Sequence, residues 1–186
     1  QGDVGVFAQS TTGDVTINAN ITRTANTGLH DGFTADGVGG YSTNGGHVKI
    51  TSVDSAVVGQ YASAVWGKST GGEVEINSGK ARAASDGTVA VSGRGDKVTI
   101  VSQDAEITGA NARAINAVAN DSGDLFVTSS RAVATGTGSI AIDVFANHDA
   151  TLTVTGQTSG AMGGVRVSAL NQAEMTVGAD ASITAT

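Results

Sequence analysis

Val74-Glu75-Ile76 and Val98-Thr99-Ile100 are two copies of one short segment that decides the fold of this 186-residue chain: an apolar residue, any residue and another apolar residue. The other copies begin at Val15, Val48, Leu125, Leu152 and Met175. Successive copies start 33, 26, 24, 27, 27 and 23 residues apart. A repeat of about 25 residues is typical of a solenoid, in which each unit stacks only on its neighbours.

Two further short strands follow each copy. About seven residues on, an alanine begins an alternating segment, as at Ala81 and Ala105, and a third apolar stretch follows a turn, as at 140–146. No segment has the 3.6-residue period of a helix over a helical length. We therefore expect an all-β fold, a right-handed parallel β-helix (a three-sided β-solenoid) of about six to seven coils. The right hand follows from the general rule for parallel crossovers.

Charged residues give an independent check on this alignment. Equivalent positions of adjacent coils lie about 4.8 Å apart, where like charges repel and opposite charges attract. The predicted pairs are Lys49 with Glu75, Arg82 with Glu106, and Asp143 with Arg166. We expect Arg82 and Glu106 to lie within ion-pair reach although 24 residues separate them.

The composition limits the partners of the chain. Ten Lys and Arg residues against 17 Asp and Glu residues give a net charge of −7, and the basic residues are scattered, which disfavours nucleic acid or an anionic membrane. No stretch reaches the roughly 20 apolar residues of a membrane-spanning helix. The chain starts at Gln1 without Met, so we expect residues 1–186 to form one β-helix domain, a fragment of a longer repeat protein.

Turns must rely on Gly, Asn, Asp and Ser, because the chain has 27 glycines and no proline. Gly93-Arg94-Gly95 and Gly136-Thr137-Gly138 are therefore expected to be coil corners. Neither segment is followed by the lysine or the helix of a phosphate-binding loop.

The first interval is longer than the others, and residues 26–46 form a candidate loop insertion that includes His30 and Tyr41. Loops that project from a rigid scaffold often carry binding function. His30, Asp31 and Asp36 are poor metal ligands together, since adjacent residues rarely present converging donors. A Gly-rich turn with polar side chains is the favoured interpretation, and we expect no metal and no cofactor.

Tyr61, Trp66 and Lys68 form an aromatic and charged cluster near the insertion. Exposed aromatic rings on a β-helix would suit stacking on a sugar or a protein contact. The favoured interpretation is instead that Trp66, two residues after the inward-type Ala64, fills the coil interior. The possible ligand contacts are Tyr61, Trp66, Lys68, Tyr41 and His30.

The sequence does not predict an enzyme. Glu73, Glu75 and Lys49 are the nearest approach to a carboxylate cluster with a basic residue, yet each has an opposite-charge neighbour in the alignment. No Gly-x-Ser-x-Gly elbow accompanies a His and an Asp in a sensible order. We therefore expect no catalytic residues in this chain.

Several segments resemble one family of secreted proteins. These segments are Gly-Asp-Val-Thr-Ile at 13–17, Gly-Asp-Lys-Val-Thr-Ile at 95–100, Gly-Asp-Leu-Phe-Val-Thr at 123–128 and Thr-Leu-Thr-Val-Thr-Gly at 151–156. With them, essentially the whole chain resembles the passenger region of a bacterial autotransporter, a secreted parallel β-helix surface protein. The resemblance implies export through an outer-membrane barrel and a role most often in adhesion or biofilm contacts, and the absence of cysteine agrees with such export.

We therefore expect a structural or adhesive module, the rigid β-helical stalk of a secreted or autotransported protein at the bacterial cell surface. Its partner would be a surface glycan or protein of a host or a bacterium, with no nucleic acid and no membrane span. A polysaccharide-binding or polysaccharide-cleaving β-helix and a filament subunit that stacks end to end through strand edges remain alternatives. An ice-binding face is disfavoured, because Lys49, Glu75 and Phe126 interrupt the outward row of threonines.

Overall fold

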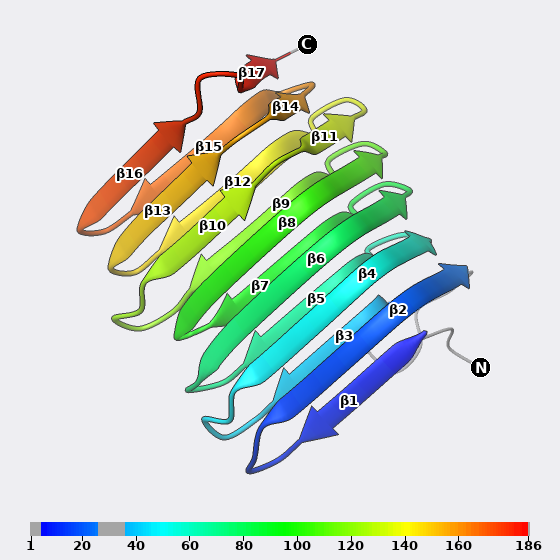
Figure 1. Ribbon diagram of the computed structural model, residues 1–186, viewed down its shortest axis with the longest axis vertical. Helices are drawn as coiled ribbons and strands as arrows, with labels where there is room; N and C mark the ends of the chain where they lie inside the picture. The colour runs from blue at the N-terminus through cyan, green and yellow to red at the C-terminus, as the bar shows by residue number, and fades with distance from the viewer. Residues whose placement is uncertain (1–4, 26–35, 186) are drawn as a thin grey trace.

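The computed structural model describes residues 5–25 and 36–185. Over these residues the chain forms 17 strands and no helix, and every paired strand is parallel. The strands stack as a β-solenoid of about six turns (Figure 1), as the repeat predicts. In this part of the chain no helix is long and apolar enough to span a membrane.

One wall of the solenoid is a seven-stranded sheet, here called sheet A, to which each turn contributes one strand. Its strands, in spatial order, are β1 (Val6–Ser10), β3 (Asp36–Ser42), β5 (Ser63–Ser69), β7 (Val89–Gly95), β9 (Arg113–Ala119), β12 (Ile140–Ala146) and β15 (Gly163–Ala169). The sheet therefore runs from one end of the described solenoid to the other.

The ten strands of sheet B form the rest of the coil. Four turns each contribute one long strand, namely β2 (Val15–Ala25), β4 (Val48–Val58), β6 (Glu73–Ala84) and β8 (Lys97–Thr108). Later turns contribute two shorter strands each, namely β10 (Leu125–Ser129) and β11 (Ala132–Thr135), β13 (Asp149–Val154) and β14 (Gln157–Gly160), and β16 (Gln172–Val177) and β17 (Ser182–Ala185).

The first two expected strands of each coil thus run together in four of the turns. The backbone ladder continues where the later turns divide, because Ser130 N donates to Ser102 O at 3.0 Å and Ala105 N donates to Arg131 O at 2.9 Å. The three expected strand positions are present, although two of them lie in one sheet.

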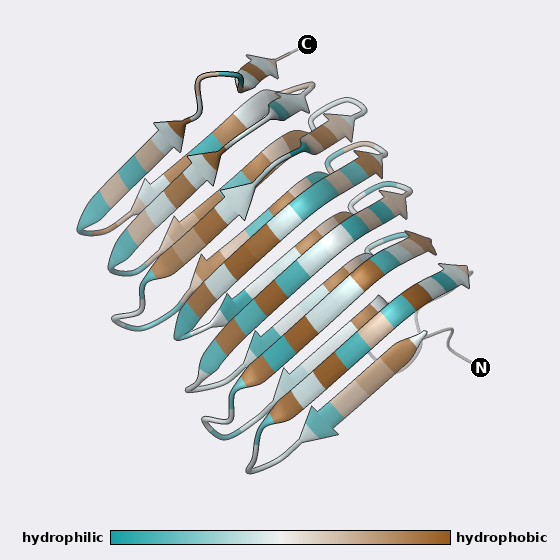
Figure 2. Ribbon diagram, viewed as in Figure 1, coloured by the Kyte–Doolittle hydropathy of each residue, from teal (hydrophilic) through white to brown (hydrophobic). Residues whose placement is uncertain are grey.

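Stacked apolar side chains fill the interior. One inward column of equivalent positions consists of Ile17, Ile50, Ile76, Ile100, Val127, Leu152 and Met175. Ile50, Ile76 and Ile100 are fully buried, whereas Met175 in the last turn is 48% exposed. Figure 2 shows the alternation of apolar and polar residues along the long strands that this packing requires.

The predicted charge pairs confirm the alignment of the turns. Lys49 Nζ lies 2.9 Å from Glu75 Oε1, Arg82 Nε lies 3.6 Å from Glu106 Oε2, and Arg166 Nη2 lies 2.5 Å from Asp143 Oδ2. The Lys49–Glu75 and Arg82–Glu106 pairs are partly exposed and are each worth only about 0 to 1 kcal/mol, so they fix register more than stability.

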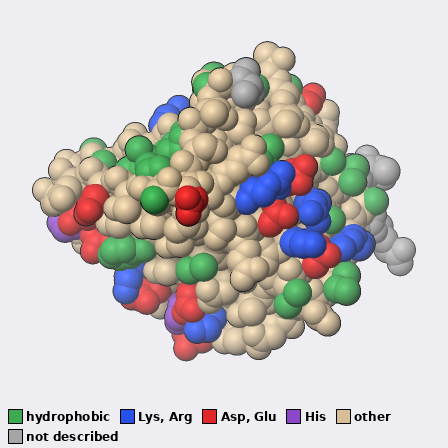
Figure 3. Space-filling model, turned by 45° about the horizontal axis from the view of Figure 1, so that its top comes forward, with side chains coloured by type: hydrophobic (Ala, Val, Ile, Leu, Met, Phe, Trp, Pro, Cys, Tyr) green, Lys and Arg blue, Asp and Glu red, His purple; other side chains and the backbone are tan. Residues whose placement is uncertain are grey.

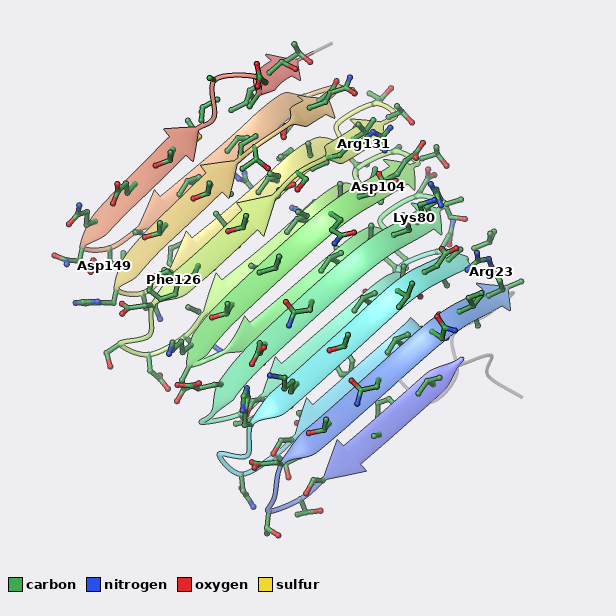
Figure 4. All side chains as sticks on the ribbon, viewed as in Figure 1. Arg23, Lys80, Asp104, Phe126, Arg131 and Asp149 are labelled. Carbon is green, nitrogen blue, oxygen red and sulfur yellow. The ribbon has the colours of Figure 1, made fainter. Side chains whose placement is uncertain are left out.

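A further charged column was not predicted. Asp54, Lys80, Asp104 and Arg131 occupy equivalent positions in four successive turns, with alternating sign. Arg23 Nη2 extends the column by lying 2.6 Å from Asp54 Oδ2. Figure 4 shows Arg23, Lys80, Asp104 and Arg131 along one edge of the solenoid, and Figure 3 shows Lys and Arg intermixed with Asp and Glu.

The candidate insertion at 26–46 is only partly a loop. Asp36–Ser42 is strand β3, which pairs in register with β1 and β5. Residues 26–35, and His30 with them, lie outside the described residues. Tyr41 therefore belongs to the regular face of sheet A.

Candidate functional site

Three of the residues singled out in the sequence lie together on the outer face of sheet A. Tyr41 on β3 and Lys68 on β5 are register partners, and Trp66 stands two residues before Lys68. Tyr61 lies elsewhere, in the turn between β4 and β5, with a left-handed φ of 57° and 62% exposure. Its ring packs against Gly87, where a Cβ atom would lie 2.8 Å from two ring carbons.

The interpretation of Trp66 as a plug in the coil interior is wrong. Val65 is fully buried, and a Cβ atom on Gly67 would lie 2.9 Å from Val74 Cγ1, so both neighbours of Trp66 face the core. Successive side chains of a strand point to opposite faces. Trp66 therefore points outward, and it is half-buried.

Trp66 is the centre of a small aromatic group. Its ring stacks on that of Phe7, with centroids 6.5 Å apart and planes at 17°, and lies 6.2 Å from the tilted ring of Tyr41. Phe7 and Trp66 are two turns apart, and the residue between them in the column is Gly39, which is buried. The missing side chain at position 39 lets the two rings approach each other.

Two cations continue this group along the sheet. Lys68 Nζ lies 5.1 Å from the centroid of the Tyr41 ring, within the range of a cation–π contact. Arg94 on β7 is the register partner of Lys68 in the next turn and is exposed. We call Phe7, Tyr41, Trp66, Lys68 and Arg94 the sheet A patch.

Sequence reasoning missed Phe7 and Arg94. The glycine pattern predicts a coil corner at 93–95, which is wrong, because these residues form the end of strand β7. A Cβ atom on Gly93 would lie 3.0 Å from Val98 Cγ1, so this glycine makes room in the core rather than a turn. The 26-residue spacing from Lys68 to Arg94, equal to that from Lys49 to Glu75, is the signal that could have found the pair.

The other end of the same face is built differently. Asp143 on β12 accepts hydrogen bonds from Arg113 Nε at 2.5 Å and from Arg166 Nε at 2.7 Å. Burial raises the pKa of Asp143, but the hydrogen bonds from Arg166 and Arg113 outweigh this effect and hold the pKa below its usual value. Asp143 therefore stays ionised and ties three turns together.

A second cluster lies at the start of β13 (Figure 4). His148 Nδ1 is 2.7 Å from Asp124 Oδ1 and 3.5 Å from Asp149 Oδ2. The hydrogen bond with Asp124 and the charge of Asp149 raise the pKa of His148. The three residues could hold a metal ion by proximity, yet Asp149 Oδ1 already accepts from Asn171 Nδ2 at 2.6 Å. This contact and the exposed position indicate a structural link between turns.

An open groove of about 540 Å³ crosses the long strands of sheet B. It is lined by amide, hydroxyl and aliphatic side chains, among them Asn20, Val53 and Asn77, with Asp54 and Lys80 at one side. Asp54 pairs with Arg23, and Lys80 stands in register between Asp54 and Asp104, so both charges at this groove have neighbours of opposite sign.

The carboxylates considered for catalysis are engaged. Glu73 Oε1 lies 3.4 Å from Lys97 Nζ. The hydrogen bond from Lys49 is the main cause of a lowered pKa at Glu75, which keeps this carboxylate ionised near neutral pH. A general acid needs a raised pKa, so Glu75 is unsuited to that role.

Comparisons with models of known protein families, with curated proteins and with solved structures find no match to this chain. The function is therefore inferred from the side chains on the outer face of sheet A.

Proposed function

We propose that this chain is an adhesive module without chemistry of its own, a rigid β-solenoid that binds a glycan through the sheet A patch. The proposal rests mainly on the outward ring group of Phe7, Trp66 and Tyr41. Aromatic residues make up only 4% of the chain, yet three of them gather on one regular face. Flat rings with a polar edge stack on the apolar faces of sugars and are frequent in binding hot spots.

The rigidity of the scaffold supports this role. Each patch residue stands on a strand whose neighbours on both sides are hydrogen-bonded turns, except Phe7 in the first described turn. Residues held on strands keep their spacing, so they lose less backbone conformational entropy on binding than residues on a mobile loop. A repeating surface glycan would therefore meet a surface already arranged for it.

The location belongs to the same proposal. The resemblance of the repeats to autotransporter passengers and the absence of cysteine support a secreted, extracellular stalk at the bacterial cell surface, in cell-surface or biofilm contacts. The opposite-charge partners of Glu73 and Glu75 support the absence of catalysis. Prolonged incubation with glycans is expected to leave their chain length unchanged, and cleavage would contradict this part of the proposal.

Trp66 makes the binding proposal directly testable, because it is the only tryptophan in the chain. Titration with oligosaccharides is expected to change the Trp66 emission, and Trp66→Ala is expected to weaken binding about tenfold or more in calorimetry. Phe126→Ala is the matched control, since Phe126 on sheet B is 41% exposed, like Phe7. An equal loss in both variants, or no binding by the unaltered chain, would contradict the proposal.

A second candidate function, end-to-end self-association, is favoured by one observation. Strand β16 is exposed along its whole length, and Val165, Met175 and Ile183 line an apolar hollow of about 310 Å³ at this end. A second copy placed head to tail would continue both parallel sheets and cover this edge. Sedimentation velocity is expected to show rods that lengthen with concentration, and Met175→Glu should suppress them. A monomer at every concentration would exclude this function.

A further inference from the structure

We propose that the ligand of the sheet A patch is an anionic glycan, whose carboxylate or sulfate group lies between the side chains of Lys68 and Arg94. This inference rests on the proposed function and names the class of sugar. The rings of Trp66 and Tyr41 would hold the sugar ring, and the two cations would select its acidic substituent.

The first support is that Lys68 and Arg94 differ from the other cations of the chain. Seven of the ten Lys and Arg residues form ion pairs with Asp or Glu, namely Arg23, Lys49, Arg82, Lys97, Arg113, Arg131 and Arg166. Lys80 stands in register between Asp54 and Asp104. Among the described residues, neither Lys68 nor Arg94 has an acidic partner or an acidic register neighbour.

The nearest carboxylate in sequence does not serve Arg94. Asp96 follows two residues later, and its pKa is raised, first by burial and then by the neighbouring charge of Asp121. A guanidinium beside this carboxyl would lower its pKa instead. Asp96 is therefore not an ion-pair partner of Arg94.

The second support is the stacking of two like charges. Lys68 and Arg94 are register partners on neighbouring strands, which lie about 4.8 Å apart, a distance at which like charges repel. The acidic register partners Asp124 and Asp149 are bridged by His148, whereas no described side chain bridges Lys68 and Arg94. An acidic group of a ligand between the two side chains would attract both and offset their repulsion.

The chemistry of the two side chains fits one oxyanion. The planar guanidinium of Arg94 offers paired donors that match a carboxylate or a sulfate, and the ammonium of Lys68 adds a compact charge beside it. Ser92 is the register partner of Trp66 on β7, so a hydroxyl-bearing side chain lies next to the ring and to Arg94. A charged sugar ring would find an aromatic face, a hydroxyl and two cations within two turns.

The test compares acidic and neutral oligosaccharides of equal length: an oligouronate, a sulfated oligosaccharide and an uncharged glucan, titrated by calorimetry in low and high salt. At least one acidic sugar is expected to bind about tenfold more tightly than the glucan, with an advantage that shrinks in high salt. Lys68→Gln and Arg94→Gln are each expected to weaken that binding about fivefold to tenfold. The matched control Lys80→Gln should change it less than twofold.

The results distinguish a failure of this inference from a failure of the proposed glycan binding. If the glucan binds as tightly as both acidic sugars, or if Arg94→Gln and Lys80→Gln behave alike, the inference is overturned while glycan binding stands. If no sugar binds, the proposed function fails as well. Tighter binding of a single-stranded oligonucleotide or an acidic peptide than of any sugar would overturn the glycan class. The two acidic sugars distinguish a carboxylate from a sulfate ligand.

Discussion

The two ends of the outer face of sheet A use arginine and lysine in opposite ways. Toward the C-terminal end, Arg113 and Arg166 converge on Asp143, which is 9% exposed. Toward the N-terminal end, Lys68 and Arg94 stand side by side with no carboxylate among the described residues to receive them. The same strand spacing and register therefore produce a tie between turns at one end and an unsatisfied positive surface at the other.

Loss of the acid at the paired end should have the largest effect. Asp143→Asn leaves Arg113 and Arg166 without their shared carboxylate, and hydrogen bonds to charged groups are worth about 1.5 to 3 kcal/mol each. We expect the free energy of unfolding, measured by urea denaturation, to fall by about 2 to 3 kcal/mol. Glu174→Gln, an exposed carboxylate without a described ion pair, should change it by less than about 0.5 kcal/mol. Equal effects would remove the contrast between the two ends.

The stabilisation by Asp143 should also depend on pH. Because the pKa of Asp143 is lowered in the folded chain, its contribution is complete above the unfolded value of about 3.9 and is lost as the pH falls through the folded pKa. The difference in unfolding free energy between the unaltered chain and Asp143→Asn should be constant from pH 7 to about pH 5 and should shrink below pH 4. A difference that grows on acidification would contradict the ion-pair interpretation.

A carboxylate introduced beside Arg94 should form an ion pair with it, as Asp143 does with Arg113 and Arg166. Val118 is the register partner of Arg94 in the next turn, so Val118→Glu places a carboxylate beside the guanidinium. We expect this variant to be about 0.5 kcal/mol more stable than Val118→Gln, which controls for the loss of the apolar side chain. It should also lose the preference for acidic sugars. If it binds them as well as Val118→Gln does, Arg94 does not face the ligand.

The smallest effect is expected from removing one of the unpaired cations. Arg94→Gln relieves the repulsion from Lys68, so the unfolding free energy should stay the same or rise by a few tenths of a kcal/mol. The gain should disappear in high salt, because the repulsion is screened. Arg166→Gln, in which a paired arginine is lost, should instead destabilise the chain. A clear loss of stability in Arg94→Gln would show a partner for this arginine.

The spacing of the repeats was sufficient to predict the turns and their register. Residues 24 to 26 apart, such as Arg82 with Glu106 and Lys49 with Glu75, meet because one coil has about that length. The column of Asp54, Lys80, Asp104 and Arg131 carries the same signal at another position of the repeat. Lys80, Asp104 and Arg131 each stand directly before an alanine of the second repeated segment, so the signal for this column is present in the sequence.

Glycine was a misleading signal in sheet A. Gly40, Gly67 and Gly93 are register partners that face the core. A Cβ atom on Gly67 would lie 2.9 Å from Val74 Cγ1, and one on Gly93 would lie 3.0 Å from Val98 Cγ1. Composition suggests turns for such residues, but here they accommodate bulky side chains of the opposite sheet.

The repeat, the parallel stacking and the pairs of charges one coil apart follow from the sequence alone, because they depend only on spacing along the chain. The side of sheet A that carries Trp66, and the presence of Phe7, Tyr41 and Arg94 in the same patch, follow only from the packing of the turns in three dimensions. In β5, Ala64 and Val65 are both buried, so alternation along the strand leaves its inward face undefined. Packing against the opposite sheet defines the inward face. Val74 leaves no room for a side chain at position 67, so Gly67 faces the core and Trp66 faces outward.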